Sequence, residues 1–507
     1  MSVTKRVVIV GGGTAGWLTA GLIASRHPRR DEDGISITLV ESPDTPTIGV
    51  GEGTWPTLRE TLGRIGIAEK DFIKRCDASF KQASRFDGWR DGTDSYYHPF
   101  TPPPEEQAVD LYAAWQSLGA DRDFADFMSP QVAACKMDLA PKAPGIEEYR
   151  GALNYAYHLD AGKFAELLRE HCTKKLGVTH ISAHVTDVDA ADNGDIAAIQ
   201  TKQAGRIEGD LFIDCTGMRS LLIGDHFGVA TRDVSDHLFN DRALVVQAPV
   251  EPGSPIASQT IGTAHSAGWI WDIGLPTRRG IGFVYSSRYC DEEQAAEGLD
   301  AYLRKSGSKS ALKDLKSRTI PFSSGWKERF FERNCVAIGL SAGFVEPLEA
   351  SAIVTIELAA SYVADHFPAD RNAMDVLAQR FNTAFSYRWQ RIEDFLKLHY
   401  VLSEREEPYW VDNRDPATMS ETLARSLDFW KVSPPSLIDF PHAEEMFPAI
   451  SYQYILYGMG FRTNLPKSYR AINPERLMQD LRHVAQARDV FTRELPTNRK
   501  WLDQVRN

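Results

Sequence analysis

An α/β fold is predicted, with a Rossmann-type nucleotide-binding unit, a β-rich region and a mainly helical C-terminal part. Three observations support it. A β-branched run, RVVIV, leads into a glycine-rich turn, GGGTAG, and then into an apolar segment with helical spacing. Strand-like stretches cluster between residues 236 and 329. Beyond residue 365, apolar residues recur at the spacing of amphipathic helices.

The glycine-rich turn has the spacing of a dinucleotide fingerprint. Gly11, Gly13 and Gly16 form G-x-G-x-x-G between the first strand and the helix at WLTAGLIASRH. Such glycines permit a tight turn and let the backbone approach a pyrophosphate at the helix N-terminus. The second strand, ISITLVE, ends in Glu41, whose carboxylate can accept hydrogen bonds from a ribose. A lone fingerprint is weak, but strand, helix and acidic residue together predict a dinucleotide site.

The nature of the dinucleotide is indicated further along the chain. Residues 207–220, IEGDLFIDCTGMRS, resemble the segment of FAD-dependent hydroxylases in which an apolar strand ends in Asp-x-x-Gly beside the cofactor. Just upstream, residues 180–206 alternate in hairpin fashion around an Asn-Gly turn. Such a meander is typical of flavoproteins of the hydroxylase and glutathione-reductase type, so FAD is predicted. There is no second fingerprint for an internal NAD(P)H site.

Composition argues against several classes of function. The net charge of −12 opposes a general phosphate-backbone binder, so no nucleic-acid partner is expected. The six cysteines lie far apart, which predicts neither a metal site nor a disulfide framework and indicates a reducing compartment. No stretch resembles a membrane span, and we expect a cytoplasmic protein without a membrane partner.

One motif points to a different enzyme class. Residues 339–343, GLSAG, fit the G-x-S-x-G pattern of a nucleophile elbow, with Ser341 as the nucleophile. The pattern follows the apolar run CVAI and precedes FVEPLEASAIVTIELAASYVADHF, which is predicted to be helical. His399, His442 or His483 could supply a base. A hydrolase is therefore an alternative, although the two FAD-type signals favour a flavoprotein.

Four further stretches are distinctive in combination. They are TIGVGEGTWPTL at 47–58, ASFK at 78–81, GWIWDIGLP at 268–276 and FVEPLEASAI at 344–353. Together with GGGTAGW, they resemble the flavin-dependent halogenases, the tryptophan-halogenase family, from the first strand to at least residue 365. The lysine of ASFK and the paired tryptophans disfavour a flavin-dependent aromatic hydroxylase, which is the second alternative.

The resemblance implies a set of cofactors and partners. FAD, reduced by a separate flavin reductase, would react with O2 and with chloride or bromide to give hypohalous acid for a small aromatic substrate. A homodimer is compatible with this scheme. Backbone N–H groups of Ser351 and Ala352 would bind the halide near a helix start. The implied FAD-binding residues are Gly11, Gly13, Thr14, Ala15, Gly16, Glu41, Ile48, Gly51, Gly53, Val185, Leu340 and Ile353.

The resemblance also implies the catalytic residues. The oxidant would pass through a tunnel walled by Trp269 and Trp271 to Lys81. An ammonium there can donate a hydrogen bond to the oxygen of hypohalous acid, whereas a neutral amine can form a haloamine, and the sequence is consistent with both. Glu349 would stabilise the cationic ring intermediate and take its proton, with Glu346 ranked second.

The substrate is expected to differ from free tryptophan. The family's W-x-W-x-I-P lacks its proline here, and P-L-E-S-T-G reads PLEASA, with Ala350 and Ala352 in place of serine and glycine. No segment after residue 400 matches the lid that grips the amino acid part of tryptophan. We therefore expect an electron-rich aromatic such as indole. In YYHPF, His98 and Phe100 match residues that flank the substrate ring.

The motif positions predict one interwoven unit over residues 1–507. The flavin module would use residues 1–90, 150–235 and 330–365, the substrate side 91–149 and 236–329, and the helical C-terminal part 366–507.

Overall fold

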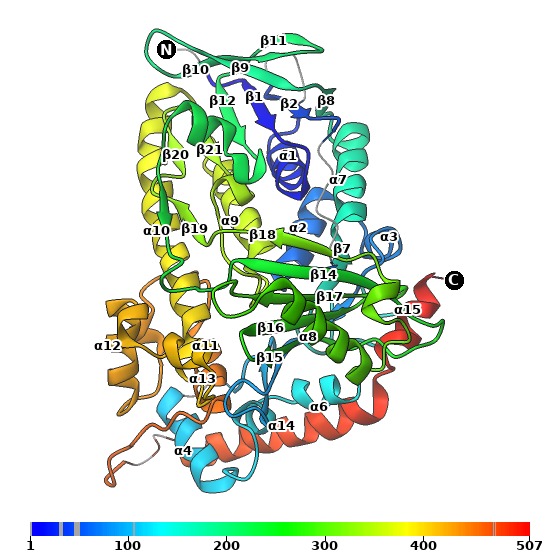
Figure 1. The fold of residues 1–507 in the computed structure, drawn as a ribbon, viewed down its shortest axis with the longest axis vertical. Coiled ribbons are helices and arrows are strands. Elements are labelled where there is room, and N and C mark those ends of the chain that lie inside the picture. The colour runs from blue at the N-terminus through cyan, green and yellow to red at the C-terminus, as the bar shows by residue number, and fades with distance from the viewer. Residues whose placement is uncertain are drawn as a thin grey trace.

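The nucleotide end of the molecule, at the top of Figure 1, is a six-stranded sheet of order β20-β21-β12-β1-β2-β8. The computed structural model describes residues 3–29, 34–44, 51–104, 107–469, 471 and 473–506. All strand pairs of this sheet are parallel except β20–β21. Its strands are β1 Arg6–Val10, β2 Ser36–Glu41, β8 Thr179–Ser182, β12 Leu211–Asp214, β20 Phe331–Glu332 and β21 Cys335–Ala337.

The predicted strand–turn–helix–strand order is confirmed. Helix α1, Thr14–Arg26, follows β1 and packs against α7, Ala161–Lys175, and α9, Ser351–Asp365. The predicted hairpin is also confirmed as an antiparallel meander of β9 Val185–Ala190, β10 Ile196–Thr201 and β11 Gly205–Glu208. Its turn places Gly194 at φ +84°, which explains the Asn-Gly sequence.

A seven-stranded sheet crosses the middle of the molecule in the order β18-β14-β17-β16-β15-β5-β6 (Figure 1). The strand of the paired tryptophans is β16, and its predicted hairpin partner is β17. Strand β5 pairs in parallel with β15 and so belongs to this sheet. The sequence assigns residues 1–90 to the flavin module, but β5 already lies in the middle sheet. The strands are β5 Ala83–Asp87, β6 Ser95–Pro99, β14 Arg242–Pro249, β15 Gln259–His265, β16 Gly268–Gly274, β17 Arg278–Tyr285 and β18 Arg318–Pro321.

A small sheet, β3-β7-β4, links the two larger ones. Strand β3 is Gly51–Gly53, β4 is Ser79–Lys81 and β7 is Ala156–Asp160. Strand β3 contacts both β16 and β17. The small sheet therefore carries the chain from the nucleotide end to the middle sheet. Another small sheet contains β13 Thr231–Asp233, β19 Gly325–Lys327 and β22 Gly343–Phe344.

Helices cover both sheets and fill the lower part of the molecule in Figure 1. The longest, α10 Arg371–Val401, runs along the long axis (Figure 1) and confirms the predicted helical C-terminal part. Part of the predicted β-rich region is helical instead, because apolar residues recur at helical spacing in α4 Ala108–Leu118. The others are α2 Thr57–Ile65, α3 Glu69–Arg75, α5 Phe124–Met128, α6 Gln131–Lys136, α8 Glu292–Lys305, α11 Pro408–Asn413, α12 Glu421–Trp430, α13 Ala449–Gly458, α14 Pro474–Glu494 and α15 Asn498–Arg506.

The structure shows the state of the cysteines, the character of the helices and the grouping of possible metal ligands. All six cysteines are buried and free. None of the helices in the described part of the chain combines the length and apolar character needed to cross a membrane. The same residues contain no cluster of three or more histidine, cysteine or acidic side chains suited to a metal ion.

Candidate active site

One cavity of about 540 Å³ extends from the glycine turn to the middle sheet. Residues 11–15 after β1 and Glu41 at the end of β2 line one part of it. Lys81, Ser84 and Thr260 line another. The volume falls within the range of roughly 300–1,000 Å³ that is usual for small-molecule sites. The nucleotide turn and the secluded lysine therefore open onto the same space.

The glycine turn has the geometry that a pyrophosphate requires. A Cβ on Gly11, where φ is +116°, would lie 2.1 Å from the carbonyl oxygen of Cys215. A Cβ on Gly16 would lie 1.9 Å from the carbonyl oxygen of Gly11. Gly13, at the N-cap of α1, borders open space instead. An anion in that space would meet unpaired N–H groups and the positive end of the helix dipole.

The carboxylate of Glu41 lies beside this turn. A Cβ on Gly12 would be 2.5 Å from Oε1 of Glu41, and Oε2 lies 3.0 Å from Nε2 of His180. A ribose in the cavity could donate to this carboxylate, so the lining fits FAD. Of the residues expected to bind FAD, Ile48 lies outside the described residues. Those that line the cavity are Gly11, Gly13, Thr14, Ala15, Glu41, Gly51, Gly53, Val185, Leu340 and Ile353. Gly16 does not line it, and packs against the carbonyl of Gly11 instead.

Lys81, at the end of β4, is a secluded lysine. Its side chain is buried, with 1% of the residue exposed. Nζ lies 5.2 Å from the centroid of the Phe100 ring and extends over Gly53, where an added Cβ would be 3.3 Å away. Burial lowers the pKa of Lys81 to about 8, against the opposing charge of Glu349. Both the ammonium and the amine are therefore accessible near neutral pH.

The carboxylate of Glu349 is enclosed by two histidines. Nδ1 of His98 lies 3.0 Å from Oε1, and Nε2 of His399 lies 3.3 Å from the same oxygen. Burial by itself would raise the pKa of Glu349. The charges and hydrogen bonds of His98 and His399 outweigh burial and hold this pKa well below its usual range. Glu349 is consequently an ionised carboxylate in a buried place.

Each of these histidines is held by a hydroxyl at its other nitrogen. The Ser451 hydroxyl lies 2.9 Å from Nε2 of His98, and the Tyr96 hydroxyl lies 3.0 Å from Nδ1 of His399. A hydroxyl can donate to the ring nitrogen that faces it or accept from it, so both rings can hold a proton on the nitrogen that faces Glu349. Nδ1 of His98 makes a hydrogen bond to this carboxylate, and Nε2 of His399 lies at ion-pair distance from it. The sequence suggests His399 only as a base for a serine nucleophile and gives no sign of its contact with Glu349. No local pattern links α10 to the loop that carries Glu349.

Helix α9 begins at Ser351, so Ser351 and Ala352 lie at a helix start as expected, whereas residues 344–350 of the segment predicted to be helical precede the helix. A proline disfavours helical backbone in the residue before it, so Pro347 disfavours a helix at Glu346. Ala350 has φ +55°, a left-handed conformation that does not continue a right-handed helix. Residues 345–350 therefore form a loop along the cavity. Ser351 and Ala352, which open the helix, line the cavity. Their N–H groups stand at the positive end of α9, where a halide would be stabilised.

The two tryptophans of β16 lie at different depths. Trp271 lines the cavity, and its ring centroid is 6.2 Å from that of Trp269. Trp269 donates its indole N–H to Glu346 at 2.7 Å. Glu346 also accepts hydrogen bonds from Asn240 at 2.6 Å and from Tyr400 at 2.8 Å. Glu346 is thus engaged in fixing Trp269, which leaves Glu349 as the better candidate for a base.

Ser341 is not arranged as a nucleophile. Its hydroxyl donates to the backbone carbonyls of Asp214 and Ile338. Strand β21 leads into a 3-10 turn, Gly339–Ser341, and then into β22, so the strand–turn–helix of a nucleophile elbow is absent here. Of the histidines suggested as its base, His399 contacts Glu349 and the other two are exposed. This geometry contradicts the hydrolase alternative.

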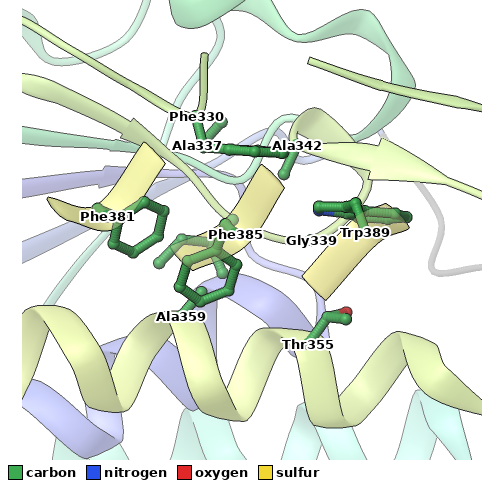
Figure 2. Close-up of a pocket in the computed structure, with 10 residues that line it drawn as sticks. Phe330, Ala337, Gly339, Ala342, Thr355, Ala359, Phe381, Phe385 and Trp389 are labelled. Carbon is green, nitrogen blue, oxygen red and sulfur yellow. The ribbon is translucent and has the colours of Figure 1, made fainter. Parts of the chain in front are cut away.

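A second hollow, of about 10 Å³, lies behind residues 339–342. Figure 2 shows the rings of Phe381, Phe385 and Trp389 of α10 around it, with Thr355 of α9 below. The hollow has room for about one water molecule. Thr355 and Trp389 line both this hollow and the large cavity. The hollow therefore lies in the wall of the large cavity and is not a separate ligand site.

The Rossmann-type sheet, the meander and the cavity from a nucleotide turn to a buried lysine define an enzyme of the flavin-dependent halogenase class. The chain belongs to the tryptophan halogenase family, whose sequence model matches residues 6–474. The predicted fold class and family are thereby confirmed.

Individual relatives resemble the whole chain. Tryptophan 6-halogenase SttH of Streptomyces toxytricini is 35% identical over 479 residues, which cover 90% of this chain and 89% of that protein. Tryptophan 6-halogenase ThaL of Streptomyces albogriseolus is 31% identical over 536 residues, covering 99% and 98%. The crystal structure of a tryptophan halogenase from Shewanella frigidimarina matches with a TM-score of 0.95 and 44% identity, covering 100% and 98%.

Proposed function

We propose that the protein halogenates an electron-rich aromatic such as indole, with FAD that a separate flavin reductase supplies in reduced form. The observation that carries the proposal is the single cavity shared by the glycine turn and Lys81. Reduced FAD, O2 and halide together supply hypohalous acid. This oxidant is small and attacks many groups, so an enclosed passage to one lysine is what selective chemistry requires.

The residues that line the cavity have separate roles in this proposal. Residues 11–15 would hold the pyrophosphate, and Glu41 would hold a ribose. Ser351 and Ala352 hold the halide through their N–H groups, and Trp271 forms part of the passage wall. Lys81 receives the oxidant, either by donating a hydrogen bond to its oxygen or by forming a haloamine.

Glu349 acts on the aromatic ring. Attack by the electrophile leaves a cationic ring, which an ionised carboxylate stabilises and then deprotonates. His98 and His399 keep Glu349 ionised and oriented. Phe100, whose ring lies 5.2 Å from Nζ of Lys81, would flank the substrate. His98, which contacts Glu349, would also flank the substrate in this proposal.

The substrate differs from free tryptophan in this proposal. Support comes from Gly274, Ala350 and Ala352, where the chain departs from the motifs of tryptophan halogenases. It also comes from the C-terminal region, which offers no match to the segment that grips an amino acid. An indole without a charged amino acid group is the substrate class that these departures favour.

Mass spectrometry of one reaction tests the function. The mixture contains the protein, FAD, a flavin reductase, NADH, O2, bromide, and either indole or tryptophan. A protein-dependent bromine isotope doublet on indole but not on tryptophan is expected. An added oxygen atom would establish the hydroxylase alternative instead. Efficient bromination of tryptophan would overturn the substrate class but keep the halogenase.

A further inference from the structure

Two polar residues outside the predicted catalytic set lie beside Lys81. Thr260, on β15, lines the cavity. If Gly53 had a Cβ, that atom would lie 3.3 Å from Nζ of Lys81, 3.4 Å from Cβ of Ala350 and 3.5 Å from Oγ1 of Thr260. Lys81, Ala350 and Thr260 therefore surround the same point beside the Cα of Gly53. The hydroxyl of Thr260 borders the same small space as the ammonium of Lys81.

His158 fixes the hydroxyl of Thr260. Its Nε2 lies 2.8 Å from Oγ1, and the residue is completely buried, with 0% exposed. On β7, His158 is paired with Gly53 on one side and Ser79 on the other, so strands hold its backbone from both sides. Burial, assisted by the charge of Lys81, holds the pKa of His158 well below its usual value. The imidazole is consequently neutral.

The position of the imidazole proton follows from its surroundings. Nδ1 of His158 is buried and has no hydrogen-bond partner among the described residues. A neutral ring carries one proton, and on Nδ1 it would be a buried donor without an acceptor. Orphaned N–H donors are rarer in proteins than under-satisfied acceptors. The proton is therefore assigned to Nε2, which donates to Thr260 and leaves the hydroxyl proton of Thr260 to point elsewhere.

We propose that Thr260 is a second hydrogen-bond donor for the hypohalous acid held at Lys81, and that His158 is the positioning residue that directs it. This inference rests on the proposed function and adds to its site. A single donor lets a small molecule pivot about one bond, whereas two donors converging on its oxygen fix the direction of its halogen. Thr260 thereby aims the oxidant, while Lys81 anchors it.

A partition experiment tests this proposal. Pre-reduced FAD is mixed with protein, bromide, O2, indole and a soluble β-diketone that traps escaped hypobromous acid. The measured quantity is the ratio of bromoindole to brominated trap. Thr260→Val keeps the shape of the side chain but removes the hydroxyl, and should lower this ratio about fivefold to tenfold. Thr260→Ser, which restores the hydroxyl, should recover most of the ratio.

Matched variants separate this role from a structural one. His158→Leu should lower the ratio in the same direction, whereas His158→Gln, which places an amide N–H near the position of Nε2, should retain more of it. Thr186→Val on the exposed meander strand β9 is the control and should match the wild type. FAD affinity, measured by fluorescence, shows whether each variant still binds cofactor.

Three outcomes would overturn the proposal. A wild-type ratio in Thr260→Val would show that the hydroxyl does not aim the oxidant. A ratio in Thr260→Ser as low as in the valine variant would assign the effect to packing. A wild-type protein that brominates neither indole nor the trap would overturn the proposed function itself, and this inference with it.

Discussion

Nε2 of His399 lies 3.3 Å from Oε1 of Glu349, although His399 belongs to α10 and Glu349 to the loop before α9. The same oxygen accepts from His98 at 3.0 Å. The contact ties helix α10 to the proposed reaction centre. It also means that the ionisation of Glu349, the proposed catalytic carboxylate, depends on a histidine from another element of the fold.

Replacing His399 should change the pH dependence of halogenation. In His399→Leu, Glu349 stays buried but loses a histidine contact that favours its ionised form, so the pKa of Glu349 rises. Because the ionised carboxylate is the active form, the acidic fall of the rate should begin at a higher pH in the variant than in the wild type, within a scan from about pH 8 down to about pH 5. Initial rates across this range measure the effect. His399→Gln should restore the wild-type profile, and an unchanged profile in His399→Leu would refute the role.

Removing Lys81 should stabilise the protein while it removes the activity. Burial lowers the pKa of Lys81 to about 8, so below that pH the folded protein holds a charge that the unfolded chain carries more easily. The destabilisation is complete below pH about 8 and disappears as the pH rises through the unfolded value of about 10.4. Lys81→Met should therefore raise the free energy of unfolding by about 3 kcal/mol at pH 7.

Urea unfolding at pH 7 and at pH 10 measures this gain, which should shrink at the higher pH. The exposed Lys74 supplies a control, and Lys74→Met should leave the stability unchanged. A Lys81→Met protein less stable than the wild type would mean that the ammonium is well compensated where it lies.

A methyl group on Gly53 should obstruct the end of the cavity. Its Cβ would lie 3.3 Å from Nζ of Lys81 and 3.4 Å from Cβ of Ala350. We expect Gly53→Ala to slow halogenation by about tenfold to a hundredfold, since small displacements of reacting groups are costly. FAD affinity measured on the same preparation separates obstruction from cofactor loss.

Gly63 provides the matched control for that change. Its added Cβ would come no closer than 3.9 Å to Tyr149, within α2. Gly63→Ala should leave halogenation unchanged and stabilise the protein by about 0.5 to 1 kcal/mol. Equal rates for the two alanine variants would show that the space above Gly53 is not used.

Ser341→Ala should leave halogenation largely intact. The hydroxyl donates to the backbone carbonyls of Asp214 and Ile338, so its removal should cost about 1 to 2 kcal/mol of stability. Bromination assays and thermal unfolding of the variant measure both effects. Loss of turnover with FAD still bound would revive the serine as a catalytic group.

Local patterns predicted the parts of the fold that local physics determines. The glycine turn, β1, β2 and the hairpin of β16 each follow from a run of neighbouring residues with one periodicity. The segment predicted to be helical begins too early, at residue 344. The left-handed residue Ala350 directly precedes α9, and alanine gives no local sign of that conformation. The contacts of His399 and of His158 with Thr260 could not be predicted, because they join elements that meet only in the folded chain.

The most direct test of the central claim is bromination of indole by the wild type and by Lys81→Met, followed by mass spectrometry with FAD, reductase, O2 and bromide present. The account predicts bromoindole from the wild type and none from the variant, although both bind FAD. Full bromination by Lys81→Met, or an oxygenated product from the wild type, would contradict it.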